Sequence, residues 1–111
     1  MSDLAQKHCK ACEGGVPELT REEIAKLHPK IASWEVSHDA KSISKHYKFK
    51  DFHQTMDFVN KLADISHHEN HHPDIRMGYN YCNVEYTTHA LNGLSENDFI
   101  CAAKVDKITG A

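Results

Sequence analysis

Histidines are the residues of this sequence whose number and spacing could do chemistry. The chain has 10 His in 111 residues, and His67, His68, His71 and His72 fall within a stretch of six positions. The ordinary pKa of imidazole lies close to neutral pH, so clustered histidines suit general acid–base catalysis. Imidazole is also a frequent ligand of transition metals. The cluster therefore points either to proton transfer or to metal binding.

The segment His71-His72-Pro73 favours proton transfer. A residue before proline avoids helical angles, so a helix should end here and hold the His pair at an element boundary. His89 follows the last expected strand, directly after Thr87-Thr88. In an antiparallel sheet with these connections, the start of the third strand and the end of the fourth lie at the same edge. We therefore expect His71, His72 and His89 to line one pocket.

The stretch from His68 to His72 also spells H-E-x-x-H, a zinc-hydrolase motif in which two His bind the metal and the Glu acts as base. That motif needs a continuous helix, but Pro73 directly follows, and no obvious third ligand lies on a following segment. We expect adventitious metal binding here and no metal in the catalytic site. A His-rich metal-binding protein remains an alternative.

Cys9-x-x-Cys12 is a second possible metal or redox motif. A structural zinc site needs four ligands, usually from two paired motifs, but Cys82 and Cys101 are isolated within apolar patterns. A thioredoxin-like motif would precede a helix, whereas Gly14-Gly15 and Pro17 follow here. We expect Cys82 and Cys101 to be core thiols, and Cys9 and Cys12 to be ordinary exposed thiols.

Composition and charge exclude several classes of protein. Hydrophobic residues make up 40% and charged residues 26%, which is typical of one globular domain, and the net charge is −3. A mildly acidic chain lacks the basic footprint of a nucleic-acid binder. The longest apolar run, Phe99 to Ala103, is far shorter than the roughly 20 residues of a membrane span. Met1 to Lys7 does not resemble a signal peptide. We expect a cytoplasmic protein with reduced thiols and neither nucleic-acid nor membrane partners.

The expected elements alternate between helical and strand periodicity. A Thr20–Glu23 capping box starts a short helix that runs to about Leu27. Strands are expected at 34–36 and 43–49, a helix from 52 to about 70, strands at 74–79 and 82–87, and a last helix capped by Ser95. This α-β-β-α-β-β-α order predicts an α+β fold, a four-stranded antiparallel sheet with helices packed on one face. Residues 1–18 should form an irregular N-terminal arm and residues 19–111 a single domain.

Side-chain patterns refine these expectations. The long helix should bury a stripe that the apolar spacing marks out, and Tyr79 should pack in the sheet. Asp98, at the third position of the last helix, should complete a capping box with Ser95, beside a hydrophobic staple. The stripe is formed by Phe52, Met56, Val59 and Ala63, widened by Thr55, Leu62 and Ile65, and the staple by Leu94 and Phe99.

The spacing of the histidines is similar to that of a known family. The chain reads His71-His72-Pro73, then Tyr79, His89 and Asp98, with Tyr86 to His89 and Gly93 to Asp98 around them. This resembles the pterin-4a-carbinolamine dehydratases, also called dimerisation cofactors of a homeodomain transcription factor. The resemblance covers about residues 19–108, including Trp34-Glu35 and the stretch from Tyr47 to Phe52. The ending from Asp98 to Lys104 resembles the bacterial branch.

The resemblance implies an activity. It would be the loss of water from 4a-hydroxytetrahydropterin to give quinonoid dihydropterin, which recycles the pterin used by aromatic amino acid hydroxylases. Such a dehydratase, a hydro-lyase, needs no metal and no redox cofactor, because the pterin is the substrate. A proton must reach the leaving hydroxyl and another must leave N5, and imidazoles can do both.

The resemblance also assigns residues. His71, His72 and His89 would be catalytic, with His71 and His89 as acid and base in either order and His72 orienting the substrate. His67 and Asn70 stand where family members often carry Glu and Asp. The substrate-binding positions would be Trp34, His67, Asn70, Pro73, Thr87, Thr88 and Asp98.

Partners follow from the same resemblance. It implies a homodimer through the sheet or a homotetramer through helices, and an aromatic amino acid hydroxylase as a possible partner protein. The alternative is a protein-binding module for a transcription factor or a hydroxylase, with catalysis secondary.

Overall fold

A four-stranded antiparallel sheet forms the centre of the structure, a computed structural model that describes residues 4–10 and 17–109. The strands lie in the order β1-β2-β4-β3, so that β1 and β3 form the two edges. Their bounds are β1 Glu35–Val36, β2 Ile43–Lys48, β3 Asp74–Met77 and β4 Tyr81–Tyr86. The two predicted strand pairs and the α+β class are confirmed.

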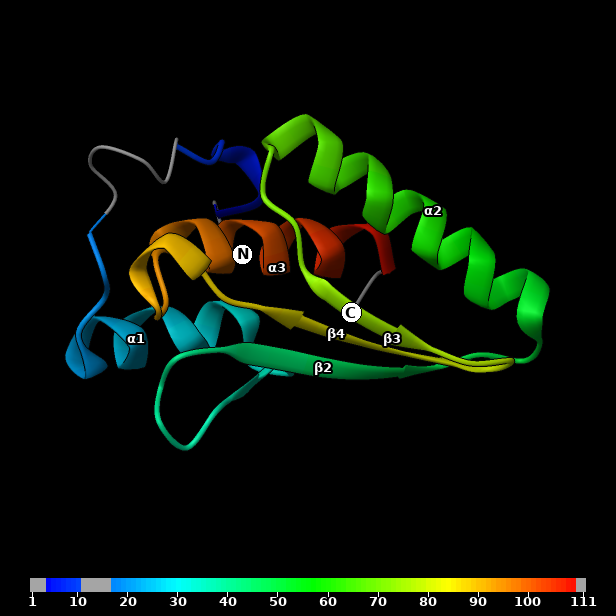
Figure 1. The fold of residues 1–111 in the computed structure, drawn as a ribbon, viewed down its shortest axis with the longest axis horizontal. Coiled ribbons are helices and arrows are strands. Elements are labelled where there is room, and N and C mark those ends of the chain that lie inside the picture. Colours follow the sequence, from blue (N-terminus) through cyan, green and yellow to red (C-terminus); the bar gives the residue numbers. More distant parts are fainter. Residues whose placement is uncertain (1–3, 11–16, 110–111) are drawn as a thin grey trace.

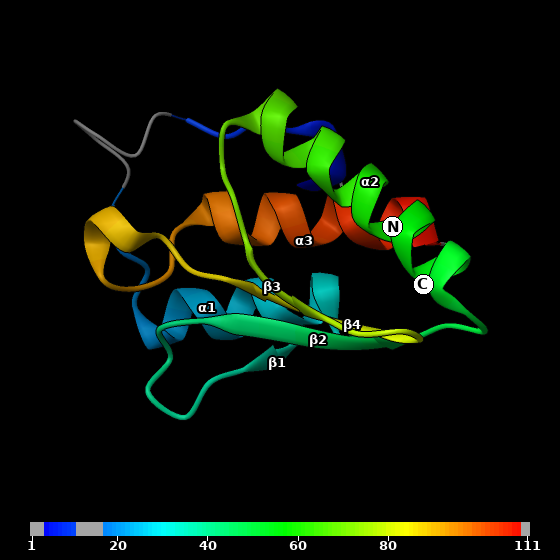
Figure 2. The ribbon, with the colours of Figure 1, turned by 45° about the vertical axis from the view of Figure 1, so that its right-hand side comes forward.

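Helices pack on one side of this sheet. Figures 1 and 2 show α2 and α3 running across that side, with α1 near the start of β2. Their bounds are α1 Arg21–Leu27, α2 Phe52–Glu69 and α3 Glu96–Thr109, and short 3-10 turns occur at Leu4–Gln6, His28–Ile31 and His89–Leu91. Among the described residues, no helix is long and apolar enough to cross a membrane.

The strand register divides the sheet into a buried and an open face. Ile43 pairs with Tyr86, and Tyr47 pairs with Cys82, and all four side chains are buried under the helices. The pairs Ser44–Glu85 and His46–Asn83, which alternate with these, point to the other face. The alternation that the sequence predicted is therefore what separates the core from the open face.

The buried face of α2 differs from the predicted stripe by about one residue. Phe52, expected in the core, is 47% exposed. The helix can turn polar side chains inward because their hydroxyls are satisfied locally: Thr55 Oγ1 donates to Asp51 O, and Ser66 Oγ donates to Leu62 O, each at 2.9 Å. The residues actually buried on α2 are Thr55, Phe58, Leu62, Ser66 and Glu69.

The end of α2 lies where the sequence predicted it. Asn70 caps the helix in a left-handed conformation (φ 52°, ψ 41°), and its N–H donates to Ser66 O. Asparagine tolerates this conformation better than most residues. The cap turns the chain sharply, so His71 leaves the helix axis and points into the protein.

The described part of the expected N-terminal arm packs against the rest of the domain. The N-terminal segment (residues 4–10) starts with a 3-10 turn and packs against α3, and Leu4 is only 1% exposed. Cys9 is half-buried, with its Sγ 3.5 Å from Cys101 Sγ, so it is not an ordinary exposed thiol. Cys12 lies outside the described residues. Cys82 and Cys101 are buried core thiols, as predicted.

Tyr79 does not pack in the sheet as expected. β3 ends at Met77, and Tyr79 lies in the turn to β4, where it is 64% exposed. Gly78 permits this tight turn, because a Cβ there would collide with the ring of Tyr81. The turn also explains why the apolar residues have odd numbers in β3 (Ile75, Met77) and even numbers in β4 (Cys82, Val84, Tyr86).

Candidate active site

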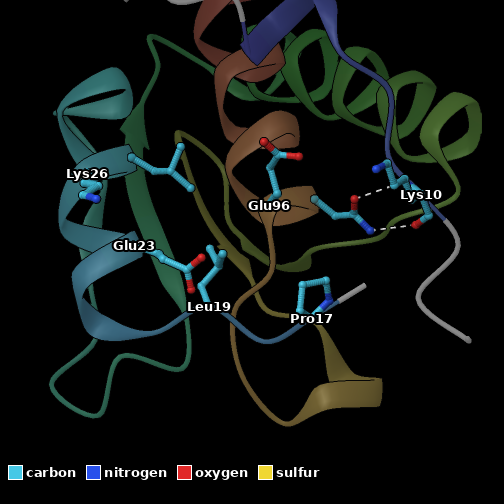
Figure 3. Close-up of a pocket in the computed structure, with 8 residues that line it drawn as sticks. Lys10, Pro17, Leu19, Glu23, Lys26 and Glu96 are labelled. Carbon is cyan, nitrogen blue, oxygen red and sulfur yellow. Dashed lines mark hydrogen bonds between the residues drawn. The ribbon is translucent and has the colours of Figure 1, made fainter. Parts of the chain in front are cut away.

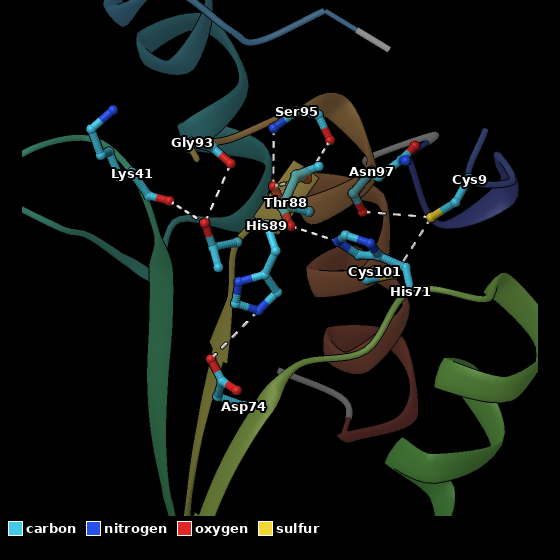
Figure 4. A network of polar contacts seen from close by, with 12 residues as sticks. Cys9, Lys41, His71, Asp74, Thr88, His89, Gly93, Ser95, Asn97 and Cys101 are labelled. Carbon is cyan, nitrogen blue, oxygen red and sulfur yellow. Dashed lines mark hydrogen bonds and ion pairs between the residues drawn. The ribbon is translucent and has the colours of Figure 1, made fainter. Parts of the chain in front are cut away.

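A buried histidine–carboxylate pair joins the end of α2 to the start of α3. His71 Nε2 lies 2.6 Å from Asp98 Oδ1, and the side chains are 7% and 0% exposed. Figure 4 shows His71 within the surrounding network of polar contacts. A short hydrogen bond between a carboxylate and an imidazole is strengthened by low surrounding polarity. It fixes the orientation of the His71 ring.

The second oxygen of Asp98 is also fully engaged. Asp98 Oδ2 accepts from Thr88 Oγ1 at 2.8 Å and from the Ser95 N–H at 3.0 Å. The Thr88 and Ser95 hydroxyls lie 2.7 Å apart. The Ser95 N–H bond is the predicted capping contact, so the same carboxylate caps α3 and holds His71. A buried carboxylate needs such partners to offset its loss of hydration.

Tyr86 supports His71 from the other side. The two rings are nearly parallel, at 8°, with centroids 5.8 Å apart. Burial raises the pKa of the Tyr86 phenol, which therefore stays protonated across the physiological range. His71 is thus held by a hydrogen bond on one side and by a stacked aromatic ring on the other.

His89 is the accessible histidine of this region. It begins the 3-10 turn that follows β4, and its Nε2 lies 4.0 Å from Asp74 Oδ2. The two side chains are 73% and 66% exposed, so this ion pair is weak. Thr88, the residue before His89, donates to Asp98. His71 is therefore buried within the Asp98 network, whereas His89, the residue after Thr88, is open to solvent and faces Asp74 (Figure 4).

His72 lies at the surface next to His67. It is exposed, and its ring lies edge-on to the ring of His67, with centroids 6.2 Å apart. Asn70, between them in sequence, is exposed and caps α2, and Pro73 is half-buried. The structure therefore pairs the predicted site residues His67 and His72 at the surface, beside the buried His71.

Trp34 is not at the surface of the site. It is 1% exposed, and its Nε1–H donates to Asp106 Oδ1 at 2.9 Å. The Trp34 ring packs on Tyr86, at a centroid distance of 5.9 Å, and Tyr86 in turn stacks on His71. Trp34 therefore supports the site through Tyr86. Thr87 is half-buried, and its Oγ1 donates to Lys41 O at 2.6 Å, which fixes the chain just before Thr88.

Two acidic residues of this region were missed by sequence reasoning. Asp74 pairs with Glu85 in the β3–β4 register, which brings it beside the end of β4 and His89. Its position directly after Pro73 was a usable signal, but the register was not known. Glu69 was read only as part of an H-E-x-x-H motif, and it is a buried carboxylate with its own partners.

The residues of the H-E-x-x-H motif do not lie on one continuous helix, because the helix ends before Pro73 as the sequence predicted. α2 ends at Glu69, so His68 and His72 do not share a helix face. Glu69 instead accepts from the Cys9 N–H at 2.7 Å and from His8 Nδ1 at 2.9 Å. Burial alone would raise the pKa of Glu69, but these bonds and the Lys104 ammonium outweigh it, and the pKa is lowered.

A cavity of about 480 Å³ lies apart from the histidines, between α1, the start of α3 and the N-terminal segment. Asn97 is joined to Lys10 by two hydrogen bonds, which are the dashed lines beside Lys10 in Figure 3. None of the site residues predicted from the sequence lines it. Its lining residues are Lys10, Pro17, Leu19, Glu23, Lys26, Leu27, Glu96 and Asn97.

Solved structures of similar fold include those of a pterin dehydratase and of a pterin dehydratase-like protein. A transcriptional coactivator/pterin dehydratase from Brucella melitensis superposes with a TM-score of 0.78 at 29% identity, covering 83% of this chain and 98% of that one. A pterin dehydratase-like protein identified as a RuBisCO assembly factor in the alpha-carboxysome gives a TM-score of 0.62 at 29% identity, covering 71% and 92%.

Sequence comparisons agree with the fold. A provisionally named pterin-4-alpha-carbinolamine dehydratase of Nitrosospira multiformis is 56% identical over 108 residues, covering 97% of this chain and 94% of that protein. Its counterpart in Legionella pneumophila (strain Lens) is 54% identical, covering 96% of each. The pattern of the pterin 4 alpha carbinolamine dehydratases matches residues 17–108. This chain therefore belongs to the pterin 4 alpha carbinolamine dehydratase family.

Proposed function

We propose that this protein dehydrates 4a-hydroxytetrahydropterin to quinonoid dihydropterin, and so recycles the pterin of an aromatic amino acid hydroxylase. Family membership and the names of the relatives support the reaction class. The observation that carries the proposal for this chain is the buried His71–Asp98 pair, joined through Thr88 to the exposed His89. Such a network supplies two imidazoles in different environments.

The reaction needs two proton transfers in opposite directions. The bond between C4a and the hydroxyl oxygen breaks as the N5 electron pair forms a double bond to C4a. The leaving hydroxyl takes up one proton and departs as water, while N5 loses its own proton. Each transfer to or from a positioned group typically contributes about 10²–10⁴-fold to the rate. No electron is gained or lost, so no redox cofactor takes part.

His71 and His89 are the proposed acid and base. Asp98, fixed by Thr88 and Ser95, stabilises positive charge on the His71 ring and holds its orientation. Asp74 gives His89 a weaker and more exposed partner. His72 completes the proposed catalytic set by orienting the substrate next to His71.

The proposed substrate contacts fall into two groups. His67, Asn70, Pro73 and Thr87 are exposed or half-buried around the histidines, where they can touch a pterin. Trp34, Thr88 and Asp98 are buried and act from beneath, by holding His71 and Tyr86 in place.

A protein-binding role is the second candidate. One similar solved structure is that of a transcriptional coactivator/pterin dehydratase. Another is that of a pterin dehydratase-like protein identified as a RuBisCO assembly factor. For this chain, such a role would use a surface patch rather than the His71 network. Binding of a partner protein that survives His71→Ala would favour this role.

The test of the proposal is stopped-flow dehydration of freshly generated 4a-hydroxytetrahydropterin by chelator-treated protein. We expect a rate well above that of buffer, and a loss of about 10²-fold or more in His71→Ala and in His89→Ala. His53→Ala is the matched control, since His53 is an exposed residue at the other end of α2, and it should keep the full rate. A wild-type rate equal to that of buffer would refute the proposal.

A further inference from the structure

A second histidine cluster lies at the C-terminal end of α2 and includes none of the proposed catalytic histidines. His8 from the N-terminal segment meets His68 and Glu69 from the last turn of α2. His8 Nδ1 is 2.9 Å from Glu69 Oε2, and the His8 and His68 rings have centroids 5.7 Å apart. One ligand atom from each of the three residues can be chosen so that all lie within 4.8 Å of one another.

The backbone holds these three side chains in place. His68 and Glu69 are fixed by the helix, and Glu69 Oε1 is held by the Cys9 N–H at 2.7 Å. After Cys9, Lys10 is tied to Asn97 through two hydrogen bonds. Before His8, Lys7 Nζ donates to Glu96 Oε2 at 2.9 Å. His8 therefore projects from a segment whose neighbours on both sides are anchored, while its own side chain is 70% exposed.

The cluster opens onto a surface groove of about 430 Å³. Asp64, one helical turn before His68, also lines this groove, so its acidic side chain offsets part of the positive charge of Lys104 and Lys107. The groove gives a hydrated ion a route to the three residues. Its lining residues are Ala5, His8, Asp64, Ile65, His68, Glu69, Lys104, Lys107 and Ile108.

We propose that His8, His68 and Glu69 bind a divalent transition metal of the zinc type. Two imidazole nitrogens and one carboxylate oxygen, with solvent completing the shell, match the ligands that Zn²⁺ takes in proteins. Mg²⁺ and Ca²⁺ prefer oxygen ligands and fit this set poorly. The hydrogen bond from Cys9 orients the carboxylate from behind and leaves Oε2 directed at His8, which is how outer groups support metal ligands.

Lys104 opposes the metal and provides a specific test of where it binds. Its Nζ lies 3.6 Å from Glu69 Oε2 and also donates to Ala5 O. A divalent ion on Oε2 would lie close to this ammonium. Removing the positive charge should tighten binding by about tenfold if water screens the repulsion strongly. A metal bound to other histidines of the chain would not respond in this way.

The metal would join the N-terminal segment to the end of α2, two residues before His71. It would replace the His8–Glu69 hydrogen bond by bonds to a common ion. Because only the folded protein brings these residues together, the metal should also raise the thermal stability. The site is separate from the His71–Asp98 pair and does not depend on the proposed dehydratase activity.

The experiment is a calorimetric titration of chelator-treated full-length protein with ZnCl₂ at constant pH, paired with thermal unfolding. We expect one tightest site per chain, which His8→Ala and His68→Ala each weaken by more than about tenfold. Lys104→Gln, which retains a donor for Ala5 O, should tighten this site. Zinc should raise the Tm of the wild type but not that of His8→Ala.

His67→Ala is the matched control, because His67 and His72 form the competing histidine pair at the surface. The tightest site should be unchanged in this variant. Equal affinity in wild type and His8→Ala, or a tightest site lost in His67→Ala, would overturn the proposal. So would a Lys104→Gln variant that binds zinc no more tightly than the wild type.

Discussion

Two buried carboxylates show how a single residue acquires its role from its partners. Asp98 accepts bonds from Thr88 and from the Ser95 N–H and faces His71, so its charge serves the proposed active site. Glu69 accepts from the Cys9 N–H and from His8, so its charge anchors the N-terminal segment. Each is nearly inaccessible to water, and each offsets its lost hydration with hydrogen bonds.

The buried thiols should be unreactive in the native protein. Burial raises the pKa of Cys82 to about 11. At pH 8 its thiolate fraction should be about two hundredfold smaller than that of an ordinary exposed cysteine, and only the thiolate reacts. Alkylation at pH 8 followed by peptide mass spectrometry should label Cys82 slowly in native protein and quickly in urea. Native labelling of Cys82 as fast as in urea would contradict the buried placement.

At the scale of elements, the end of α2 decides where His71 points. Asn70 adopts the left-handed conformation that turns the chain out of the helix, and Asp98 in the first turn of α3 receives the imidazole. One helix end and one helix start thus form a rigid frame for the pair. A change in either should be felt at His71.

Substitutions of Asn70 should separate its backbone role from its proposed contact with the pterin. Asn70→Gly should keep the stability, because glycine adopts this conformation freely, while a lost hydrogen bond to substrate should raise KM about fivefold. Asn70→Val should lower the free energy of unfolding by about 1–2 kcal/mol, because a β-branched residue is strained there. Urea unfolding and steady-state kinetics measure the two effects. An unchanged KM in Asn70→Gly would limit Asn70 to helix capping.

Glu69→Gln should lower stability in a pH-dependent way when metal is removed by chelator. The pKa of Glu69 is lower in the folded protein than its ordinary value of 4.5, so the carboxylate stabilises the fold above that pH. This contribution is lost as the pH falls through the folded-state pKa. We expect a difference of about 2 kcal/mol from wild type at pH 7, shrinking below about pH 4.5.

Urea unfolding at several pH values tests the role of Glu69, with Glu22→Gln as control, since Glu22 is exposed in the first turn of α1. The control should lie within a few tenths of a kcal/mol of wild type. A Glu69→Gln deficit that is the same at pH 3.5 and pH 7 would contradict the charge-based explanation.

The order of the elements was predictable because each leaves a local signal. The capping box at Thr20, the left-handed cap at Asn70 before Pro73 and the alternation in β2 depend on neighbouring residues only. The face that α2 buries was predictable only in part. Thr55 and Leu62 of the predicted stripe are buried, whereas Ser66 is polar and enters the core through a hydrogen bond to a backbone carbonyl.

The candidate site was predictable in its histidines and less so in its connections. The His71–Asp98 pair joins residues 27 positions apart, and sequence reasoning assigned Asp98 a capping role that proves compatible with it. The Asp74–His89 contact depends on strand register, and the burial of Trp34 depends on how α3 crosses the sheet. Long-range geometry of this kind leaves no local pattern in the sequence.

At the scale of the whole molecule, β3 provides an edge through which the sheet can associate. It is an edge strand four residues long, and Ile75 in it is 41% exposed. Exposed edge strands offer unpaired backbone groups to another chain. We therefore predict that two copies pair through this edge of the sheet.

Light scattering after gel filtration should show a homodimer or a larger symmetric assembly of dimers. Ile75→Lys should shift the protein towards monomer, because it places a charge at the contact and removes apolar area. Ile108→Lys is the matched control, since Ile108 has a similar exposure of 38% but lies on α3. A monomeric wild type, or an Ile75→Lys variant that assembles as fully as the control, would contradict association through β3.

The central claim is that His71 and Asp98 act as one catalytic pair. The direct test is a double-mutant cycle on kcat with His71→Ala, Asp98→Asn and the double variant, using freshly generated 4a-hydroxytetrahydropterin. Because Asp98 acts through His71, we expect each single change to lower kcat by about 10²-fold or more, and the double variant to be little slower than His71→Ala. Losses that multiply in the double variant, or a His71→Ala variant with wild-type kcat, would contradict the account.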